Sequence, residues 1–223
     1  MQKRLVIAID GPSGAGKSTV ALAVAQRLRY RCVDSGAMYR AVALLALENK
    51  TSLADGPALA KLAESADMRF EHKDGVNHLF LNGEDASKAI RFPGVTDASS
   101  IVATHQEVRD ILVRRQQEMG REGGVVMEGR DIGTRVFPNA ELKIFLIASA
   151  DVRASRRHRE MDDKIPAASD EVLRDMAERD RRDQERKISP LMPAEDSVEI
   201  DATDLTADKV VEKIIVLAGM RTQ

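Results

Sequence analysis

The sequence contains little cysteine, few aromatic residues and no long apolar run. Cys32 is the only cysteine among 223 residues, which excludes an intramolecular disulfide and a cysteine-built zinc site. We interpret Cys32 as a small buried hydrophobe in a reducing, cytoplasmic environment. The apolar run after Lys3 and Arg4 is too short for a signal peptide, and no run approaches the ~18 apolar residues that cross a bilayer.

An excess of charge of one sign is also missing. The 34 Lys and Arg residues nearly balance the 36 Asp and Glu residues, which gives a net charge of −2 and a pI near 6.1. This balance argues against general binding to nucleic acid, and the 3% aromatic content leaves few rings to stack on bases. A phosphate ligand must therefore be met by local arginines. The length suits one domain, with or without an insert.

What the sequence does contain is a complete phosphate-binding loop. Residues 11–18 fill every position of the Walker A motif, between an apolar run (5–9) and a helix-forming run (20–28). Glycines let successive N–H groups point into one anion-sized concavity, and the helix N-terminus adds its dipole. The lysine supplies charge for the β and γ phosphates, and the serine offers a hydroxyl to Mg²⁺. The predicted ATP-binding residues here are Gly11, Pro12, Ser13, Gly14, Ala15, Gly16, Lys17, Ser18 and Thr19, with Ser18 as the metal ligand.

A second polar stretch, residues 34–40, precedes a helix-forming run at 41–48. Asp34 or Ser35 is suited to cap that helix. Capping does not account for Tyr39 and Arg40, which stand one turn further in. A phenol and a guanidinium near a helix start suit a sugar and a phosphate.

A third polar stretch, residues 129–134, follows the apolar run 125–127. Ligands of open α/β sheets gather outside the carboxyl ends of the strands, so Arg130 and Asp131 are expected where a second substrate reaches the phosphate-binding loop. The residues alone leave three interpretations of Asp131 open: a magnesium ligand, a catalytic base, or a reader of the acceptor.

Short alternating runs interrupt the α/β pattern between the second and third stretches. Residues 68–72 and 76–81 are separated by Lys73-Asp74-Gly75, and Asn82-Gly83 marks a second turn. This pattern predicts an antiparallel meander within an insert of about residues 60–95. We interpret His72 and His78 as residues of a strand face, because no carboxylate or cysteine pattern for a metal accompanies them.

Two arginine-rich segments follow the buried-type strand 142–147. Residues 151–166 carry several arginines between breaker residues, which suits either a lid over the triphosphate or an exposed charged helix. Residues 170–187 contain thirteen charged residues out of eighteen, with Arg179, Arg182 and Arg186 on one helix face and Asp183 placed as a partner of Arg179. A charged run of this kind is usually a solvated helix. We favour a role in binding phosphates, because the substrate phosphates need a cluster of arginines such as this one.

The remaining runs complete an α/β pattern. We expect a helix at 56–66, two helices within 95–121, a strand at 198–201 and a helix at 206–220. In the helix at 107–119, the expected polar face carries Arg109, Arg114 and Arg115.

Taken together, residues 11–17, 34–40, 129–134 and 178–191 make the chain similar to the bacterial cytidylate kinases, over about residues 4–217. The first motif is shared by many ATPases, whereas the second and third together are specific. The resemblance implies a single α/β P-loop kinase domain over 1–223: a three-layer fold with a central parallel sheet flanked by helices. It also implies a small antiparallel insert that binds the acceptor (60–95) and a helical lid (151–166).

The resemblance also implies roles for individual residues. Asp131 becomes a reader of cytosine, because donor and acceptor groups from Arg109 and Asp131 match the edge of that base, and uracil reverses part of the pattern. The implied CMP-binding residues are Ser35, Tyr39, Arg40, Ser100, Arg109, Arg130, Asp131, Arg179, Asp183 and Arg186. Arg156 and Arg157 would lie near ATP, and the implied catalytic residues are Lys17, Arg130, Arg157 and Arg186.

The implied reaction transfers the γ-phosphoryl group of Mg-ATP to CMP or dCMP. We expect Mg²⁺ as cofactor and a monomer that acts on small molecules, with neither nucleic acid nor a membrane as partner. A GTPase switch is disfavoured, because Asn49-Lys50-Thr51-Ser52 fails the guanine-reading pattern at its last position. Among kinases, UMP, AMP and shikimate are the rival acceptors.

Overall fold

The structure, a computed structural model, describes residues 4–160 and 169–222. The chain divides into two compact units. The first unit consists of Met1–Arg31 and Gly123–Gln223, and the second of Cys32–Glu122.

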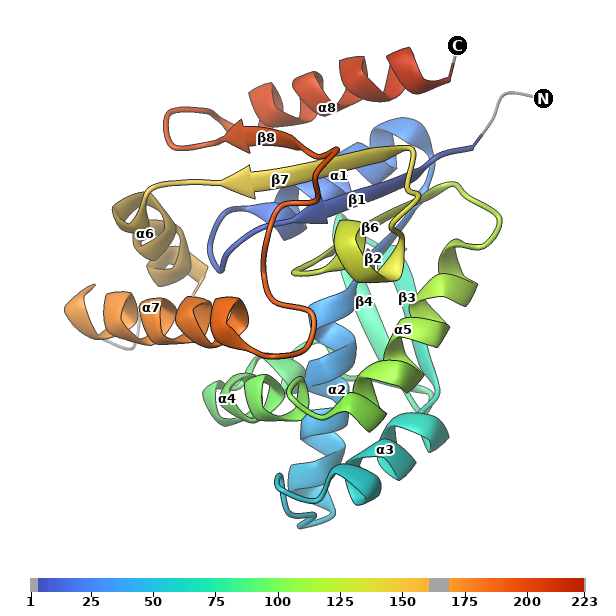
Figure 1. Cartoon of the computed structure of the whole chain (residues 1–223), viewed down its shortest axis with the longest axis vertical. Helices are drawn as coiled ribbons and strands as arrows, with labels where there is room; N and C mark the ends of the chain where they lie inside the picture. Colours follow the sequence, from blue (N-terminus) through green and yellow to red (C-terminus); the bar gives the residue numbers. More distant parts are fainter. Residues whose placement is uncertain (1–3, 161–168, 223) are drawn as a thin grey trace. The chain divides into compact units, whose positions relative to one another are not determined.

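Most of a five-stranded sheet with the order β2-β6-β1-β7-β8 belongs to the first unit, since only residues 32–34 of β2 fall outside it (Figure 1). Strand β1 pairs in parallel with β6 and β7, and β7 pairs in parallel with β8. Strand β1 ends at Asp10, which lies opposite Gly129 of β6 and Phe145 of β7, so the phosphate-binding loop leaves the sheet at this edge. The strands are β1 (Val6–Asp10), β2 (Arg31–Asp34), β6 (Val125–Gly129), β7 (Leu142–Ile147) and β8 (Val198–Asp201).

The central strands are continuous apolar runs because both their faces are covered. Helices α1 (Lys17–Leu28) and α8 (Ala207–Arg221) pack on each other and on the sheet, and the π-helical turn η2 (Ile132–Val136) packs on β1 and β6. Val210, Val211 and Ile214 of α8 are buried as the periodicity predicts. These observations confirm the predicted parallel sheet with flanking helices.

Helices α6 (Ala150–Glu160) and α7 (Ser169–Glu185) pack against each other through Ala154, Met176 and Leu173. The first part of the predicted lid, up to residue 160, is therefore helical. Residues 161–166 of that prediction lie outside the described residues.

The second unit is built around α2 (Ser35–Glu48), which packs against α3 (Gly56–Ser65), α4 (Pro93–Val102), α5 (Gln106–Gly120) and the short turn η1 (Ala89–Arg91). Of the two residues predicted to cap α2, Asp34 is the cap and Ser35 is the first helical residue. Oδ1 of Asp34 accepts a hydrogen bond from the Ala37 N–H at 2.9 Å, so the helix begins before its most helix-forming run, residues 41–48.

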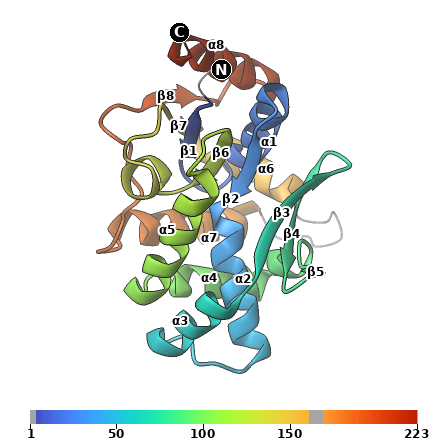
Figure 2. The same cartoon turned by 90° about the vertical axis from the view of Figure 1, so that its right-hand side faces the viewer.

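The second unit also contains the predicted antiparallel meander (Figure 2). Its strands are β3 (Met68–Lys73), β4 (Val76–Leu81) and β5 (Glu84–Asp85). Asp74-Gly75 and Asn82-Gly83 all have positive φ, the geometry that two-residue hairpins require. The turn residues thus determine the hairpins, and the predicted small antiparallel sheet is confirmed.

None of the helices in residues 4–160 and 169–222 has the length and apolar character needed to cross a membrane.

Candidate active site

The phosphate-binding loop joins β1 to α1, as the sequence predicts. Gly11 has φ of 148°, and a Cβ there would stand 2.1 Å from the carbonyl oxygen of Leu146. Gly14 has φ of 71°, and a Cβ there would stand 2.7 Å from the carbonyl oxygen of Arg153. Larger residues are therefore excluded at both positions by conformation and by contact with neighbouring backbone.

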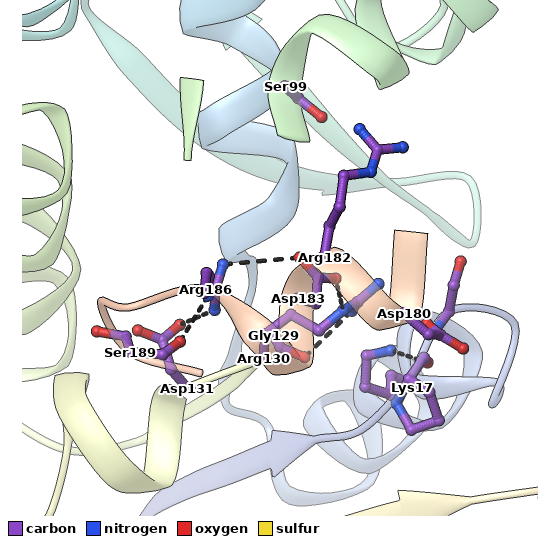
Figure 3. A network of polar contacts seen from close by, with 12 residues as sticks. Lys17, Ser99, Gly129, Arg130, Asp131, Asp180, Arg182, Asp183, Arg186 and Ser189 are labelled. Atoms are coloured by element: carbon purple, nitrogen blue, oxygen red, sulfur yellow. Dashed lines mark hydrogen bonds and ion pairs between the residues drawn. The ribbon is translucent and has the colours of Figure 1, made fainter. Parts of the chain in front are cut away.

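Lys17 lies buried at the start of α1, where its Nζ donates a hydrogen bond to the Pro12 carbonyl at 2.7 Å (Figure 3). Burial and, after it, the positive charge of Arg130 lower the pKa of Lys17 from 10.5 to about 7, against the opposing effects of Glu128 and Asp10. A phosphate anion at this loop would favour the charged form. Lys17 is thus placed where its charge can interact with a bound polyanion.

Helices α6 and α7 contact the loop through a charged pair that the sequence did not indicate. Oδ1 of Asp180 accepts a hydrogen bond from the Ser13 N–H at 2.9 Å, and Arg153 Nη1 donates to the Ser13 carbonyl at 2.9 Å. Arg153 and Asp180 also form an ion pair with each other. The two residues thus hold both main-chain polar groups of Ser13, the N–H and the carbonyl.

Arg156, one of the two predicted lid arginines, is hydrogen-bonded to the same loop. Its Nη1 donates to the Ala15 carbonyl at 3.0 Å and its Nη2 to the Ala202 carbonyl at 2.8 Å. Arg157 is half-buried on the same helix. Arg156 is thereby placed beside the phosphate-binding loop.

A network of buried charges lies after β6 (Figure 3). Arg130 Nε donates to Oδ2 of Asp183 at 2.9 Å. Arg186 Nη1 lies 3.7 Å from Oδ1 of Asp183, and its Nη2 lies 3.9 Å from Oδ1 of Asp131. Arg186 also donates through Nε to the Ser189 carbonyl at 2.6 Å. Four predicted acceptor residues, Arg130, Asp131, Asp183 and Arg186, are therefore brought together.

The arginines of this network favour the ionised form of Asp183. Burial alone would raise the pKa of Asp183, but Arg130, Arg186 and Arg179 hold that pKa below its usual value. Arg130, from a segment far away in the chain, donates a hydrogen bond to Asp183. Arg179, the partner that the helix spacing predicts, also acts on Asp183 through its charge.

The side chain of Arg182 does not belong to this network. It is exposed, and its Nε lies 3.6 Å from a carboxylate oxygen of Glu178. Only the carbonyl of Arg182 takes part, by accepting a hydrogen bond from the Arg186 N–H. The predicted arginine stripe is thus divided between a buried cluster and a solvated face.

Two buried carboxylates without an assigned role also lie in this unit. Glu128 is 4% exposed at the end of β6, and its charge raises the pKa of both Lys17 and Arg130. Asp10 is 5% exposed at the end of β1. Both residues could have been identified from the sequence, because each carboxylate lies at the end of a buried-type strand that leads toward the site.

The other predicted acceptor residues lie in the second unit. Ser35, Tyr39 and Arg40 occupy the first turns of α2, and Ser100 is half-buried in α4. Arg40 Nη2 donates to Oδ2 of Asp34 at 2.8 Å, while its buried Nε has no hydrogen-bond partner in the described part of the chain.

Arg109 corrects the prediction for the polar face of α5. It is 2% exposed, and its guanidinium lies 5.4 Å from the centre of the Tyr39 ring and donates to the Ala103 carbonyl at 3.2 Å. Arg109 falls in helical register with the buried Leu112, Val113 and Gln116, so the spacing itself could have shown that it faces inward. Arg114 and Arg115, by contrast, bind Glu64 and main-chain carbonyls near the end of α3.

A resident metal cage is not found: no group of three or more His, Cys, Asp or Glu side chains in residues 4–160 and 169–222 is arranged to hold a metal ion. The exposed Ser18 lies in the first turn of α1, as the motif predicts. A single hydroxyl fits Mg²⁺ that takes its other ligands from phosphates and water.

Comparisons with known proteins agree with this arrangement. The family model described as cytidylate kinase matches residues 7–219. The chain is 47% identical over 216 residues to cytidylate kinases of Bacillus thuringiensis (strain Al Hakam) and Bacillus cereus (strain AH187), covering 96% of each chain.

Solved structures share the fold at low identity. An uncharacterized protein from Eubacterium ventriosum ATCC 27560 has a TM-score of 0.53 at 15% identity, with 98% of this chain and 99% of that chain covered. A shikimate kinase from Bacteroides thetaiotaomicron has a TM-score of 0.50 at 14% identity, with 96% and 98% covered. These likenesses show a P-loop kinase fold and do not identify the substrate that accepts the phosphoryl group. The family model and the identity to the curated relatives show that the chain belongs to the cytidylate kinases.

Proposed function

We propose that this cytidylate kinase transfers the γ-phosphoryl group of Mg-ATP to CMP or dCMP, yielding CDP or dCDP and ADP. The observation that carries the proposal is the buried network of Arg130, Asp183, Arg186 and Asp131 in the same unit as the phosphate-binding loop. Arginines and carboxylates in one buried cluster offer both a phosphate site and polar groups that recognise a nucleoside.

The reaction needs positioning and charge neutralisation more than proton transfer. An acceptor phosphate oxygen, already anionic, attacks the γ-phosphorus, and the bond from that phosphorus to the bridging oxygen of ADP breaks. No strong general base is required. Lys17, Arg130, Arg157 and Arg186 are assigned to the negative charge of the donor, the acceptor and the transferred group.

Mg²⁺ is assigned to the Ser18 hydroxyl and to the phosphates of ATP. When bound, it neutralises charge on the β and γ oxygens. The protein's own contribution at this point is to expose Ser18 in the first turn of α1 and to hold the loop through Asp180 and Arg153.

We assign cytosine recognition to Ser35, Ser100, Arg109 and Asp131, sugar binding to Tyr39, Arg179 and Asp183, and the acceptor phosphate to Arg40, Arg130 and Arg186. An oxygen of Asp131 would accept from the exocyclic amino group of cytosine but would face a carbonyl in uracil. Residues 60–95 are proposed as the acceptor-binding insert and 151–166 as the lid, whose closure would exclude water and limit ATP hydrolysis.

The proposal is tested by following the transferred group itself. The protein is incubated with ATP labelled in its γ-phosphoryl group, with CMP or dCMP and with or without Mg²⁺, and the products are separated. We expect label in CDP and dCDP only when Mg²⁺ is present. Label found only in inorganic phosphate, or transferred equally well without a divalent cation, would overturn the proposal.

A further inference from the structure

The buried carboxylate of Asp10 makes two hydrogen bonds to a distant segment of the chain. Its Oδ1 accepts from the Ile132 N–H at 2.8 Å, and its Oδ2 accepts from the Gly133 N–H at 2.7 Å. These two groups open the π-helical turn η2, whose own N-cap residue, Asp131, provides no side-chain cap. Asp10 therefore caps this turn from the end of β1.

The cap defines the backbone around Arg130 and Asp131. Asp10 pairs with Gly129 in the β1–β6 ladder, so the sheet fixes the chain up to Gly129. The carboxylate fixes it again from Ile132 onward. Only the dipeptide Arg130-Asp131 lies between these two anchors, and both anchors involve the same aspartate.

A methyl group at Gly133 would touch this carboxylate. A Cβ added there would lie 3.4 Å from Oδ2 of Asp10, an ordinary van der Waals distance, and 3.2 Å from Cδ of the Lys143 side chain. Since Asp10 immediately precedes Gly11, the same residue joins the start of the phosphate-binding loop to the segment that follows β6.

We infer that Asp10 is a positioning residue for the acceptor, because its carboxylate holds the Arg130-Asp131 dipeptide in register for binding and reading CMP. This inference rests on the proposed roles of Arg130 and Asp131. Asp10 acts through these two residues, and its loss should therefore weaken acceptor binding and base selectivity more than donor binding.

The test is Asp10→Asn, which keeps the shape of the side chain but replaces one accepting oxygen with an amide that faces an N–H. We expect KM for CMP to rise by about 10-fold or more and the preference for CMP over UMP to fall. The dissociation constant of a non-hydrolysable ATP analogue should change several-fold less. Asp55→Asn is the matched control, since Asp55 caps α3 at the Ala58 N–H and has no assigned role in binding.

A second variant changes Gly133, the residue whose N–H donates to the Asp10 carboxylate. Gly133→Ala should shift KM for CMP and the CMP preference in the same direction, by a smaller factor, whereas Gly219→Ala, with open space around it in α8, should not. Circular dichroism checks that each variant is folded. Equal changes in CMP and ATP binding, or an unchanged CMP preference in both Asp10→Asn and Gly133→Ala, would overturn the inference.

The wild-type protein distinguishes a failure of the proposed function from a failure of the positioning role of Asp10. A wild-type protein that fails to prefer CMP would overturn the proposed function, whereas a CMP-selective wild type with an equally selective Asp10→Asn would overturn only the positioning role.

Discussion

Arg130 and Asp183 form a buried ion pair that joins the segment after β6 to helix α7. The Nε of Arg130 donates to Oδ2 of Asp183 at 2.9 Å, and the side chains are 19% and 11% exposed. Burial opposes the charged form of both groups, yet the pair keeps the pKa of Arg130 above and that of Asp183 below their ordinary values. The charges of the proposed acceptor site are therefore maintained by contacts within the protein.

Asp183→Ala should weaken both the fold and the site. Removal of the carboxylate leaves a buried guanidinium without its partner, so we expect the free energy of unfolding to fall by about 3 kcal/mol. KM for CMP should rise, because Arg130 loses its orientation. Urea unfolding and steady-state kinetics measure the two effects.

The matched control for this variant is Arg181→Ala on the same helix. Arg181 pairs with Glu178 and Glu185 in solvent, and exposed pairs contribute little. Its unfolding midpoint and its KM for CMP should equal those of the wild type. Equal loss of stability in both variants would show that the buried pair has no special role.

Lys17→Met should stabilise the nucleotide-free protein while abolishing turnover. Because the pKa of Lys17 is about 7 in the folded state and 10.5 otherwise, the unfolded state binds more protons between these values, and stability rises with pH across that window. Removing the buried ammonium should add on the order of 1–3 kcal/mol at pH 7. Thermal unfolding and ADP formation measure the outcome. Retained turnover would contradict the assignment of the loop, and lower stability would contradict the burial argument.

Asp180→Asn should affect the donor rather than the acceptor. Asp180 accepts from the Ser13 N–H and pairs with Arg153, so its charge holds the phosphate-binding loop. We expect KM for ATP to rise by about 3- to 10-fold, with a smaller change in KM for CMP. The opposite pattern, with CMP affected more than ATP, would show that Asp180 acts on the acceptor site.

The titration of Asp10 predicts how stability depends on pH. Burial raises the pKa of Asp10 to about 6, against the opposing effect of its hydrogen bonds from Gly133 and Ile132. The folded state then binds more protons than the unfolded state between pH 3.8 and about 6, so the contribution of Asp10 to stability falls as pH rises through this window.

Asp10→Asn has no titratable group at this position, so the difference in stability between the wild type and this variant reports the titration of Asp10. The free energy of unfolding of the wild type minus that of the variant should decrease by on the order of 1–3 kcal/mol between about pH 4.5 and 7.5. Urea unfolding at several pH values measures the difference. A constant or increasing difference would mean that the pKa of Asp10 is not raised.

The fold was predictable from the sequence wherever local signals determine it. The strand, glycine loop and helix around residues 5–28 form as predicted, and Asp74-Gly75 and Asn82-Gly83 specify the hairpins of the meander. The cap of α2 also follows from a local signal, because Asp34, one of the two residues predicted to cap this helix, accepts from the Ala37 N–H.

The site was predictable in its residue types but not in its pairings. Asp183 bonds Arg130 across 53 residues, Asp180 bonds Ser13 across 167, and Asp10 bonds Ile132 across 122. Such contacts arise when the folded chain brings strand ends, loops and helix α7 together, and no local periodicity predicts them. The π-helical turn η2 was not predicted for the same reason: its cap comes from Asp10, in another strand.

Acceptor selectivity is the property that depends most directly on the proposed cytosine site. ADP formation is measured in a coupled assay with Mg-ATP and, separately, CMP, dCMP, UMP, AMP, GMP and no acceptor. We expect strong turnover with CMP and dCMP, weak turnover with UMP and almost none without an acceptor. Equal ATP consumption without an acceptor, or turnover with AMP alone, would contradict the cytosine site assigned to Arg109 and Asp131.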